Sequence, residues 1–558
     1  MLSRLGPPLT VLLLAGPILA GLLGTILPAF GYLPALGGGG FSLDPFRHLF
    51  DQPGIGMSVM LSLVTGLVTT AVSLLIVLVF VAGFAGTRLF GQVQHVISPL
   101  LSVPHAAAAF GLAFLIAPSG MIARMLSPEL TGWERPPDFL IVSDPMGLSM
   151  TIGLIVKEVP FLLLIMLAAL PQVDLARSRQ LSISLGYGRI AGFIFGPWAP
   201  IYRQIRLAVF AVLAFSTSVV DVAAILGPTT PAPLAMRLTA WMNDPELSTR
   251  FLASAGALLQ LGVTAAALLI WIGIEHMAVW LRGNLAGAGR RFRHDRMVGA
   301  AGLGAMLLSA LAIFGGLAVL GLWSIAGLWQ FPDALPTEIT GQTWMNAMPR
   351  IVRPLETTLL VALLSTAIAT FLTLLCLIRE NETGRIAGRG ALALIYLPLI
   401  VPQVAFLFGL QLLFILGGAA GLVSLVAAHL VFVLPYVFLS LSDPWRTYDR
   451  RYEAVAAGLG KSRRTTLFRV RMPMLLRAIL TAAAVGFAVS IGLYLPTLLI
   501  GAGRLTTITT EAVALASGGN RRVIGVYAFL QSALPALGFL VATAVPALIF
   551  RNRRAMRG

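Results

Sequence analysis

The segment YDRRYEAVAAGLGKSRRTTLFRVRMPMLLRAIL (448–480) lies between two long apolar stretches and has the most distinctive pattern in the chain. Four of its residues recur at helical spacing on one face: Tyr452, Val455, Ala456 and Leu459. We therefore predict a short helix from about Arg450 to Leu459, which Gly460 can end in a left-handed conformation. A basic stretch follows, and Pro473 stands just before the next apolar run. An ordinary solvated loop is the alternative interpretation.

The apolar stretches on both sides of this segment predict a membrane protein. Of the 558 residues, 58% are hydrophobic and 11% are charged, whereas about 25% are charged in soluble globular chains. The mean hydropathy is +0.90. A bilayer core takes about 20 apolar residues per helix. The sequence thus predicts an all-α integral membrane protein with twelve spans at 8–29, 57–84, 96–117, 148–170, 206–227, 251–281, 299–328, 355–378, 390–417, 420–441, 476–500 and 523–550.

Two of these spans admit another interpretation. The joint LGGAAG (416–421) between the ninth and tenth spans could lie within a single bent segment. The first span could be a signal peptide, because Arg4 precedes its apolar run. That run is about 20 residues long, which exceeds a typical signal core, and no convincing cleavage site follows it. We therefore expect a retained helix.

The basic residues predict how the spans are oriented. An even number of spans places both termini on one side, and 28 Lys and Arg residues fall on that side against ten on the other. The remaining basic residue, Lys157, lies inside the fourth span. Because loops rich in Lys and Arg stay in the cytoplasm, we expect both termini there.

The chain is predicted to consist of two similar halves, residues 1–286 and 287–558. The segment RGNLAGAGRRFRHDR (282–296) is polar, glycine-rich and basic, as expected of a linker. The third and ninth spans carry VPHAAAAFGL (103–112) and VPQVAFLFGL (401–410), which match in register. Each half has six spans, so the repeat is parallel. Helix packing alone could also favour recurrent small residues, so the match indicates duplication without marking a binding site.

Charge and composition exclude several classes of protein. The net charge is +17, but the basic residues lie in short segments between apolar runs, so we expect no nucleic-acid binding. Cys376 is the only cysteine, which excludes an internal disulfide and a cysteine zinc site. No cluster of His, Asp and Glu has metal-ligand spacing. No G-x-x-x-x-G-K-[ST] phosphate loop is present, so the chain should not hydrolyse ATP by that route. We expect no cofactor, no metal and no catalytic residue.

The 448–480 segment resembles the cytoplasmic signature of binding-protein-dependent ABC importer permeases. That signature is E-A-A, three residues, G, nine residues and I-x-L-P. Nine residues separate Gly460 from Val470, and Met472 and Pro473 stand where L-P belongs. The three E-A-A positions hold Ala454, Val455 and Ala456. The acid is therefore displaced by one position, to Glu453.

The first half carries a weaker copy of the signature, RSRQLSISLGYGRIAGFIFGPWAP (177–200). Gly186 takes the place of the signature glycine, and Gln180 stands where the acid belongs. Pro200 comes one residue later than Pro473 does in the second copy. Both copies follow the fourth span of their half, which strengthens the resemblance.

The resemblance covers the whole chain, because permeases with both halves fused in one polypeptide are a known variant of the family. The chain looks most like the thiamine-type and ferric-iron-type branch, and particularly like thiamine permeases. The stretches that resemble them are GWERPPD (132–138), DPMGL (144–148), KEVPFLL (157–163) and SVVDVAAILGP (218–228). The resemblance implies a type I ABC importer permease fold in a bacterial inner membrane.

The resemblance also implies a division of labour among subunits. Two cytoplasmic ATP-binding subunits would bind the two short loop helices. A separate periplasmic or extracellular substrate-binding protein would deliver the substrate, which could be thiamine or another small solute, cations included. ATP-driven closure of the ATPases would rock the two halves between inward-open and outward-open states.

Three charged residues inside the spans are candidates for the substrate pathway. Lys157 and Glu158 lie near the middle of the fourth span, where a charge costs about 2.5–3.5 kcal/mol on insertion scales. A structural role for them is equally consistent with the sequence. Asp221 lies in the outer part of the fifth span, where it could attract a cation, form a hydrogen bond between helices or pair with Lys157. His105 is expected to be a packed polar residue.

Two other classes of membrane protein compete with the permease. An ion-coupled carrier of the major facilitator type would have the same span count, but it usually carries an acid in the loop after the second span. That loop is GTRLFGQVQH (86–95) here, with no acid. A carrier would also leave the two glycine-containing loops unexplained. A membrane-embedded enzyme would need clustered catalytic residues, and the six scattered His residues do not supply them.

Overall fold

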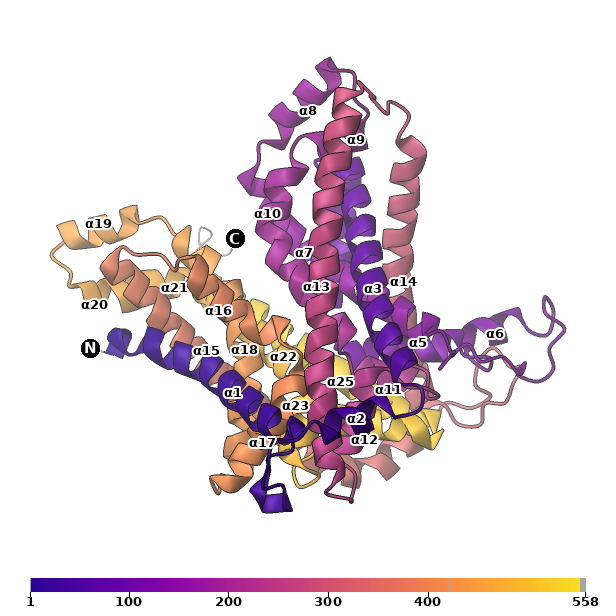
Figure 1. Cartoon of the computed structure of the whole chain (residues 1–558). Helices are drawn as coiled ribbons and strands as arrows, with labels where there is room; N and C mark the ends of the chain where they lie inside the picture. The colour runs from indigo at the N-terminus through magenta and orange to yellow at the C-terminus, as the bar shows by residue number, and fades with distance from the viewer. Residues whose placement is uncertain (1, 420, 552–558) are drawn as a thin grey trace.

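The computed structural model describes residues 2–419 and 421–551, and every regular element in these ranges is a helix (Figure 1). Within these described ranges, ten helices are long and apolar enough to cross a membrane, or up to twelve when each bent pair counts as one span. This confirms the all-α membrane fold. Position 420 and the terminal arginines Arg553, Arg554 and Arg557, which contributed to the charge count, lie outside the described residues.

The membrane helices follow the predicted spans closely at most positions. Nine of them are single helices: α1 (Gly6–Ala29), α3 (Ile55–Phe84), α7 (Leu148–Ala169), α10 (Trp198–Thr217), α13 (Thr249–Gly287), α14 (Arg296–Ile325), α15 (Gln342–Thr383), α18 (Leu422–Arg446) and α25 (Arg521–Ile549). The remaining apolar segments are α5 (His105–Ile116), α16 (Arg389–Ile400), α17 (Gln403–Leu416), α22 (Leu476–Gly492) and α23 (Leu495–Gly501). The ninth and tenth spans are separate helices, because α17 ends at Leu416 and α18 begins at Leu422.

Shorter helices lie between or beside the membrane helices. They are α2 (Asp44–Phe50), α4 (Arg88–Ile97), α6 (Met121–Leu126), α8 (Leu175–Ser184), α9 (Arg189–Phe195), α11 (Asp221–Leu226), α12 (Leu234–Met242), α19 (Arg451–Gly458), α20 (Arg463–Thr466), α21 (Met472–Met474) and α24 (Ile508–Ala514). Two of them, α8 and α19, occupy the loops that carry the signature-like sequences. We call the side of the molecule on which they lie the α8/α19 end.

Several predicted spans are interrupted, which is where the structure corrects the sequence analysis. The third span, expected at 96–117, becomes helical in α5 only after Pro104. The ninth is broken before Pro402, and its two helices meet at 87°. Proline disfavours helical geometry in the residue before it, which explains both interruptions. The fifth span breaks between α10 and α11, and the eleventh between α22 and α23.

The first helix of each predicted half packs against the other half. Helix α1 lies against α17 and α15, and α14 lies against α5 and α3 (Figure 1). The glycines of the repeated sequence make these crossings possible. A Cβ on Gly111 would lie 2.8 Å from the Cα of Gly316 in α14, and a Cβ on Gly24 in α1 would lie 2.8 Å from the carbonyl oxygen of Gly409. The matching glycines therefore serve close helix packing.

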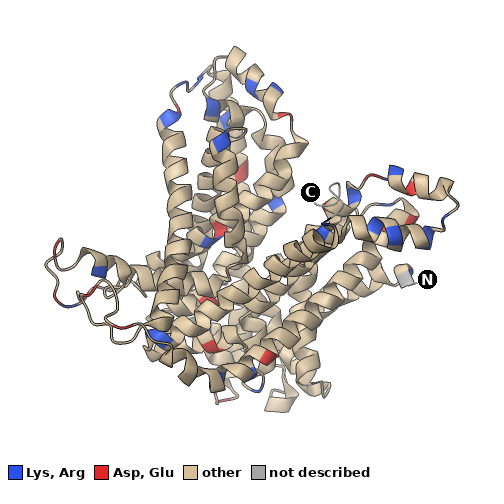
Figure 2. Ribbon diagram, turned by 180° about the vertical axis from the view of Figure 1, so that it is seen from behind, with Lys and Arg blue, Asp and Glu red and all other residues tan. Residues whose placement is uncertain are grey.

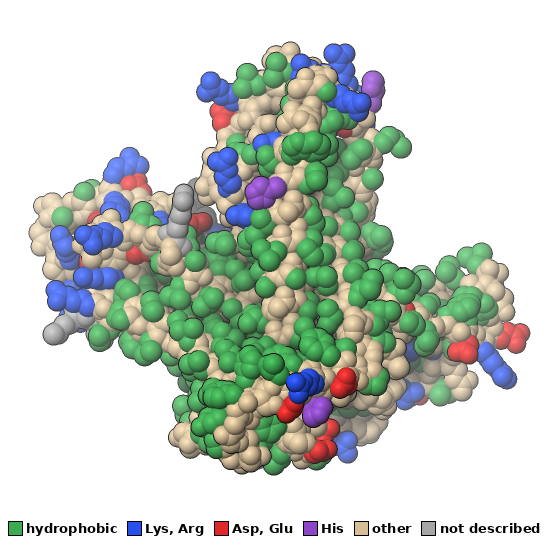
Figure 3. All heavy atoms as spheres, viewed as in Figure 1, with side chains coloured by type: hydrophobic (Ala, Val, Ile, Leu, Met, Phe, Trp, Pro, Cys, Tyr) green, Lys and Arg blue, Asp and Glu red, His purple; other side chains and the backbone are tan. Residues whose placement is uncertain are grey.

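The molecule has two arms that diverge toward the α8/α19 end. One arm carries α8 at its tip and the other carries α19, and the space-filling view shows a notch between them (Figure 3). Exposed apolar side chains cover the middle of the helices, for example Leu12, Leu19 and Leu23 on α1. Most Lys and Arg residues gather near the two arm tips (Figure 2). This distribution is that of a protein whose apolar belt faces lipid.

Candidate functional site

Helix α19 and Gly460 have the geometry that the sequence predicted. The helix ends at Gly458, and Gly460 follows with φ of +69°, in the left-handed region. The amide of Lys461 donates a hydrogen bond to the carbonyl of Ala456 at 3.0 Å, which closes the helix end. Only Ala456 on the predicted apolar face is buried. Three apolar side chains on this element are exposed: Tyr452, Val455 and Leu459.

Glu453, the acid of this loop, joins α19 to the last residues of the loop before the next membrane helix. An oxygen of Glu453 accepts a hydrogen bond from the Arg471 guanidinium at 3.1 Å, and the Arg471 side chain is only 2% exposed. Arg471 also donates to the carbonyl of Trp445 at 3.1 Å, and its guanidinium lies 4.2 Å from the centroid of the Trp445 ring. Burial raises the pKa of the neighbouring Tyr448, and Glu453 adds to this effect. Nothing in the sequence distinguished Arg471 from the other Lys and Arg residues of the segment 448–480.

Replacing Glu453 with alanine should loosen the α19 loop. It would leave the buried Arg471 guanidinium without its counter-charge, which typically costs about 1–3 kcal/mol. We expect faster hydrogen exchange in α19 and faster protease cleavage of residues 451–471 in purified protein. Arg451→Ala is the matched control, since it removes a solvent-exposed ion pair to Asp449 and keeps the hydrogen bond from the amide of residue 451 to Asp449. Equal protection in both variants would show that the Glu453–Arg471 pair does not hold the loop.

The loop in the first predicted half also has a short helix followed by a glycine of positive φ, but different hydrogen bonds stabilise it. Helix α8 begins after Asp174, whose side chain accepts a hydrogen bond from the Arg177 amide at 2.9 Å. Gly186 follows the helix with φ of +75°. Gln180, at the acid position, is exposed, and Pro200 lies in the first turn of α10. Three apolar side chains at this element are exposed: Leu181, Ile183 and Leu185.

Lys157 and Glu158 point to different partners. The ammonium of Lys157 donates to the carbonyls of Leu100 at 3.1 Å and Leu101 at 3.4 Å, so it ties α7 to the turn that precedes α5. An oxygen of Glu158 lies 3.1 Å from Nε2 of His105. The Lys157 contacts support the structural alternative for that residue. His105, expected to be a packed polar residue, lies at hydrogen-bonding distance from a buried acid.

Asp221 lies at the interruption of the fifth span, as the first residue of α11. Its side chain is buried, and no side chain of the described residues donates a hydrogen bond to it. The expected alternative of an ion pair with Lys157 is not seen in this structure. Asp221 interacts electrostatically with His105 and with Tyr494. Tyr494 precedes α23, at the equivalent interruption in the second half.

The electrostatic interactions and the His105–Glu158 pair indicate one acidic cluster, drawn from both predicted halves. Asp221, Glu158 and His105 come from the first half, and Tyr494 comes from the second. Tyr436 of α18 interacts electrostatically with Glu158 and is also a second-half residue. Two carboxylates, a half-exposed imidazole and two phenol rings can bind a small cation by charge, hydrogen bonding and ring contact. Neither tyrosine carried a sequence signal that pointed to Asp221 or Glu158.

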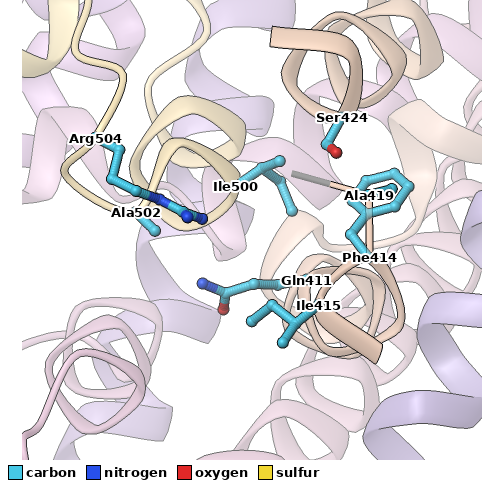
Figure 4. A pocket seen from close by; sticks show the side chains of 8 residues that line it. All are labelled: Gln411, Phe414, Ile415, Ala419, Ser424, Ile500, Ala502 and Arg504. Carbon is cyan, nitrogen blue, oxygen red and sulfur yellow. The ribbon is translucent and has the colours of Figure 1, made fainter. Parts of the chain in front are cut away.

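Two cavities lie away from this cluster. One of about 20 Å³ lies between α17, α18 and α23, beside Gln411, Ser424 and Arg504 (Figure 4). It has room for a single water molecule. A larger cavity of about 360 Å³ lies between the first turns of α15 and α25, lined by Arg350 and Arg522 among others. Among the described residues, no group of His, Cys, Asp and Glu could hold a metal ion.

Comparison with known proteins gives a consistent picture over most of the chain. Residues 374–554 match the family model described as binding-protein-dependent transport system inner membrane component. The inner membrane ABC transporter permease protein YnjC of Escherichia coli (strain K12) is 30% identical over 524 residues, which cover 92% of this chain and 93% of YnjC.

Two shorter relatives match a smaller part of the chain. The molybdenum transport system permease protein ModB of Mycobacterium bovis is 32% identical over 182 residues, which cover 29% of this chain and 68% of ModB. The putrescine transport system permease protein PotI of E. coli (strain K12) is 28% identical over 188 residues, which cover 31% of this chain and 67% of PotI.

Proposed function

Since the chain belongs to the family of binding-protein-dependent ABC transporter permeases, we propose that its two halves form one pathway for the import of a small solute. Members of this family are non-catalytic, multi-pass inner membrane subunits that work with an ATPase and a substrate-binding protein. Membership in this family replaces the ion-coupled carrier and the membrane enzyme as interpretations. The proposed halves remain residues 1–286 and 287–558.

The coupling function is proposed for the loops that contain α8 and α19. The observation that carries it is a shared design, in which a short helix with exposed apolar side chains ends before a glycine of positive φ. A water-exposed apolar patch marks a surface for a partner. We place one cytoplasmic ATPase subunit on each helix. This makes the α8/α19 end and both termini cytoplasmic, in agreement with the excess of basic residues there.

The notch between the two arms supports an alternating mechanism. It opens toward the α8/α19 end (Figure 3), so the described conformation would be open to the cytoplasm. Closure of two ATPase subunits on ATP would draw α8 and α19 together. Because the arms meet near the opposite end, their rotation would open the pathway to the outside. A substrate-binding protein would dock at that outer end.

The acidic cluster supports a small cation as the substrate. A buried carboxylate without a hydrogen-bonding side chain favours a positively charged partner. Asp221 fits this description, and the buried Glu158 has Nε2 of His105 at 3.1 Å from its carboxylate. Lys157 donates its hydrogen bonds to backbone carbonyls, and its charge also interacts with Glu158, the next residue in α7. Thiamine is one such cation. None of the three relatives is named for thiamine, so this choice rests on the sequence resemblance.

The larger cavity, between the beginnings of α15 and α25, supports a docking surface for the binding protein. Arg350 and Arg522 line it at the end opposite α8 and α19. No ion pair to either arginine is seen among the described residues. Acidic side chains on a partner would complement them, and such rim charges chiefly accelerate association.

The proposal is tested by ATP hydrolysis in proteoliposomes. The purified chain alone should hydrolyse no ATP, and hydrolysis should appear when its ATPase subunit is added, rising further with the loaded binding protein. An ATPase subunit with its phosphate-loop lysine replaced serves as the control for contaminants. Robust hydrolysis by the chain alone, unchanged by that control, would contradict the proposal.

A further inference from the structure

The linker between the halves is bound to the first of the two proposed coupling loops. The sequence predicted it to be a polar connector, and a flexible tether would need no contacts. We call residues 288–295, between α13 and α14, the linker segment. In the structure it lies against residues 186–191, which join α8 to α9.

Three hydrogen bonds join the linker segment to the turn after α8. The amide of Gly188 donates to the carbonyl of Arg291 at 3.3 Å, and Nε of Arg293 donates to the carbonyl of Gly186 at 3.3 Å. The Arg291 guanidinium donates to the Tyr187 hydroxyl at 2.7 Å and lies 4.7 Å from its ring centroid. Because the Arg291 guanidinium makes both a hydrogen bond and a ring contact with Tyr187, it fixes the direction of the turn.

Asp295 fixes the start of α9. One of its carboxylate oxygens accepts hydrogen bonds from the amides of Ile190 at 2.6 Å and Ala191 at 3.4 Å. These amides belong to the first helical turn, where backbone N–H groups have no hydrogen-bond acceptor within the helix. An acid is favourable there because it also faces the positive end of the helix dipole. Asp295 stands directly before α14, so this cap connects α9 to the second half.

The close fit of the linker segment explains the glycine at position 188. A Cβ on Gly188 would lie 2.5 Å from the Asp295 carboxylate and even closer to the carbonyl oxygen of Phe292. Any larger residue would therefore displace the linker segment or the turn. This steric requirement arises from packing, because Gly188 has an extended backbone with φ of −62°.

The contacts also account for the departure of the first loop from the family signature. In the second loop, Glu453 supplies an acid from within α19 and pairs with Arg471. In the first loop, the acid position is held by Gln180, which is exposed. Asp295 of the linker segment supplies an acid to the first loop from outside it. The first loop thus has two acids, Asp174 at the start of α8 and Asp295 of the linker segment at the start of α9, whereas Glu453 of the second loop lies within α19 itself.

From this geometry we infer that the linker segment is a positioning part of the first coupling loop, and that Asp295 holds α9 and the turn before it as Glu453 holds α19. The inference rests on the proposed function and adds an asymmetry to it. The first ATPase subunit would meet a loop whose orientation depends on the linker. The second would meet a loop that is held by its own residues.

Two altered chains separate a positioning role from a tether. In the first, residues 291–295 are replaced by a Gly-Ser sequence of equal length, which keeps the tether and removes the contacts. In the second, a protease site is placed after Gly287 in the full chain, and the assembled complex is cleaved, which removes the tether and keeps the contacts. Co-purification of the ATPase, ATPase stimulation and membrane abundance are measured for both.

We expect the Gly-Ser chain to insert normally but to stimulate the ATPase about five- to tenfold less, the factor that a lost helix cap typically brings. The cleaved complex should keep its stimulation. Asp295→Ala should act like the Gly-Ser chain, and Asp295→Asn, which retains an acceptor oxygen, should recover part of the activity. Arg290→Ala and His294→Ala alter exposed linker residues and should change nothing.

The outcomes distinguish a failure of the proposed function from a failure of the linker inference. If the unaltered chain fails to stimulate any ATPase, the proposed function is wrong. If the unaltered and Gly-Ser chains stimulate it equally, only the linker inference is overturned. The same holds if cleavage after Gly287 abolishes stimulation while the Gly-Ser chain retains it, because the linker would then be a tether.

Discussion

Replacing Gly460 with valine should abolish transport while leaving the protein in the membrane at near-normal abundance. Gly460 has φ of +69°, and a Cβ at this position would have no neighbouring atom within 4 Å, so the cost is one of backbone strain alone. A β-branched residue is disfavoured in the left-handed region by about 1–2 kcal/mol. That is small against global stability but enough to redirect the chain after α19. The ATPase subunit should no longer co-purify.

Matched variants make this expectation specific. Gly458→Val introduces the same side chain two residues earlier, inside α19 and also in open space, and should leave transport largely intact. Gly460→Asn should retain part of the activity, because asparagine tolerates positive φ. Full association and full transport by Gly460→Val would show that the α19 loop is not the coupling element. Gly186, with φ of +75°, faces the same strain on substitution.

Replacing Asp221 with asparagine should lower transport about tenfold or more while leaving abundance unchanged. The side chains are nearly equal in size, and no side chain in the described residues loses a hydrogen bond to the Asp221 carboxylate. What changes is the charge within the acidic cluster. Hydrogen bonds to charged groups contribute about 1.5–3 kcal/mol, which corresponds to a factor of roughly ten to a hundred.

Uptake per membrane-inserted molecule is the deciding measurement for Asp221→Asn. It should be made with a cationic substrate, such as thiamine or putrescine, and with a neutral analogue of similar size, because the loss should be confined to the cation. Asp138→Asn, which removes an exposed acid from a loop, is the control. If Asp221→Asn is merely less abundant and transports normally per molecule, Asp221 has a packing role.

Much of the fold follows from local sequence patterns. Long apolar runs predicted the membrane helices, and helical spacing followed by Gly460 predicted α19 and its end. Both depend on neighbours within one or two helical turns. The interruptions of the spans were missed because a membrane protein can satisfy broken backbone inside the bundle. Proline offered a signal at Pro104 and Pro402, but nothing in the apolar sequence marked the break before Asp221.

Contacts between distant segments were beyond what the sequence alone could predict. The hydrogen bond of Glu453 with Arg471, the pairing of Glu158 with His105 and the cap by Asp295 each depend on the tertiary fold. Glu453 and Glu158 were visible as unusual residues, but the sequence did not indicate which distant residue each would contact. The matching glycines Gly111 and Gly409 were visible as a repeat, yet their role at helix crossings required the positions of α14 and α1.

The crossing of α1 onto the second half has a consequence for how the protein is made. The amide of Gly409 donates to the hydroxyl of Thr25 in α1, and these residues are 384 positions apart. At about 5–20 residues per second, a ribosome needs roughly 20–80 s to synthesise the intervening chain. During that time α1 is in the bilayer without its partner helix, and its glycine face meets lipid. The final packing of the first helix against α17 therefore waits for about three quarters of the chain, and a nascent protein truncated before α17 cannot bury it there.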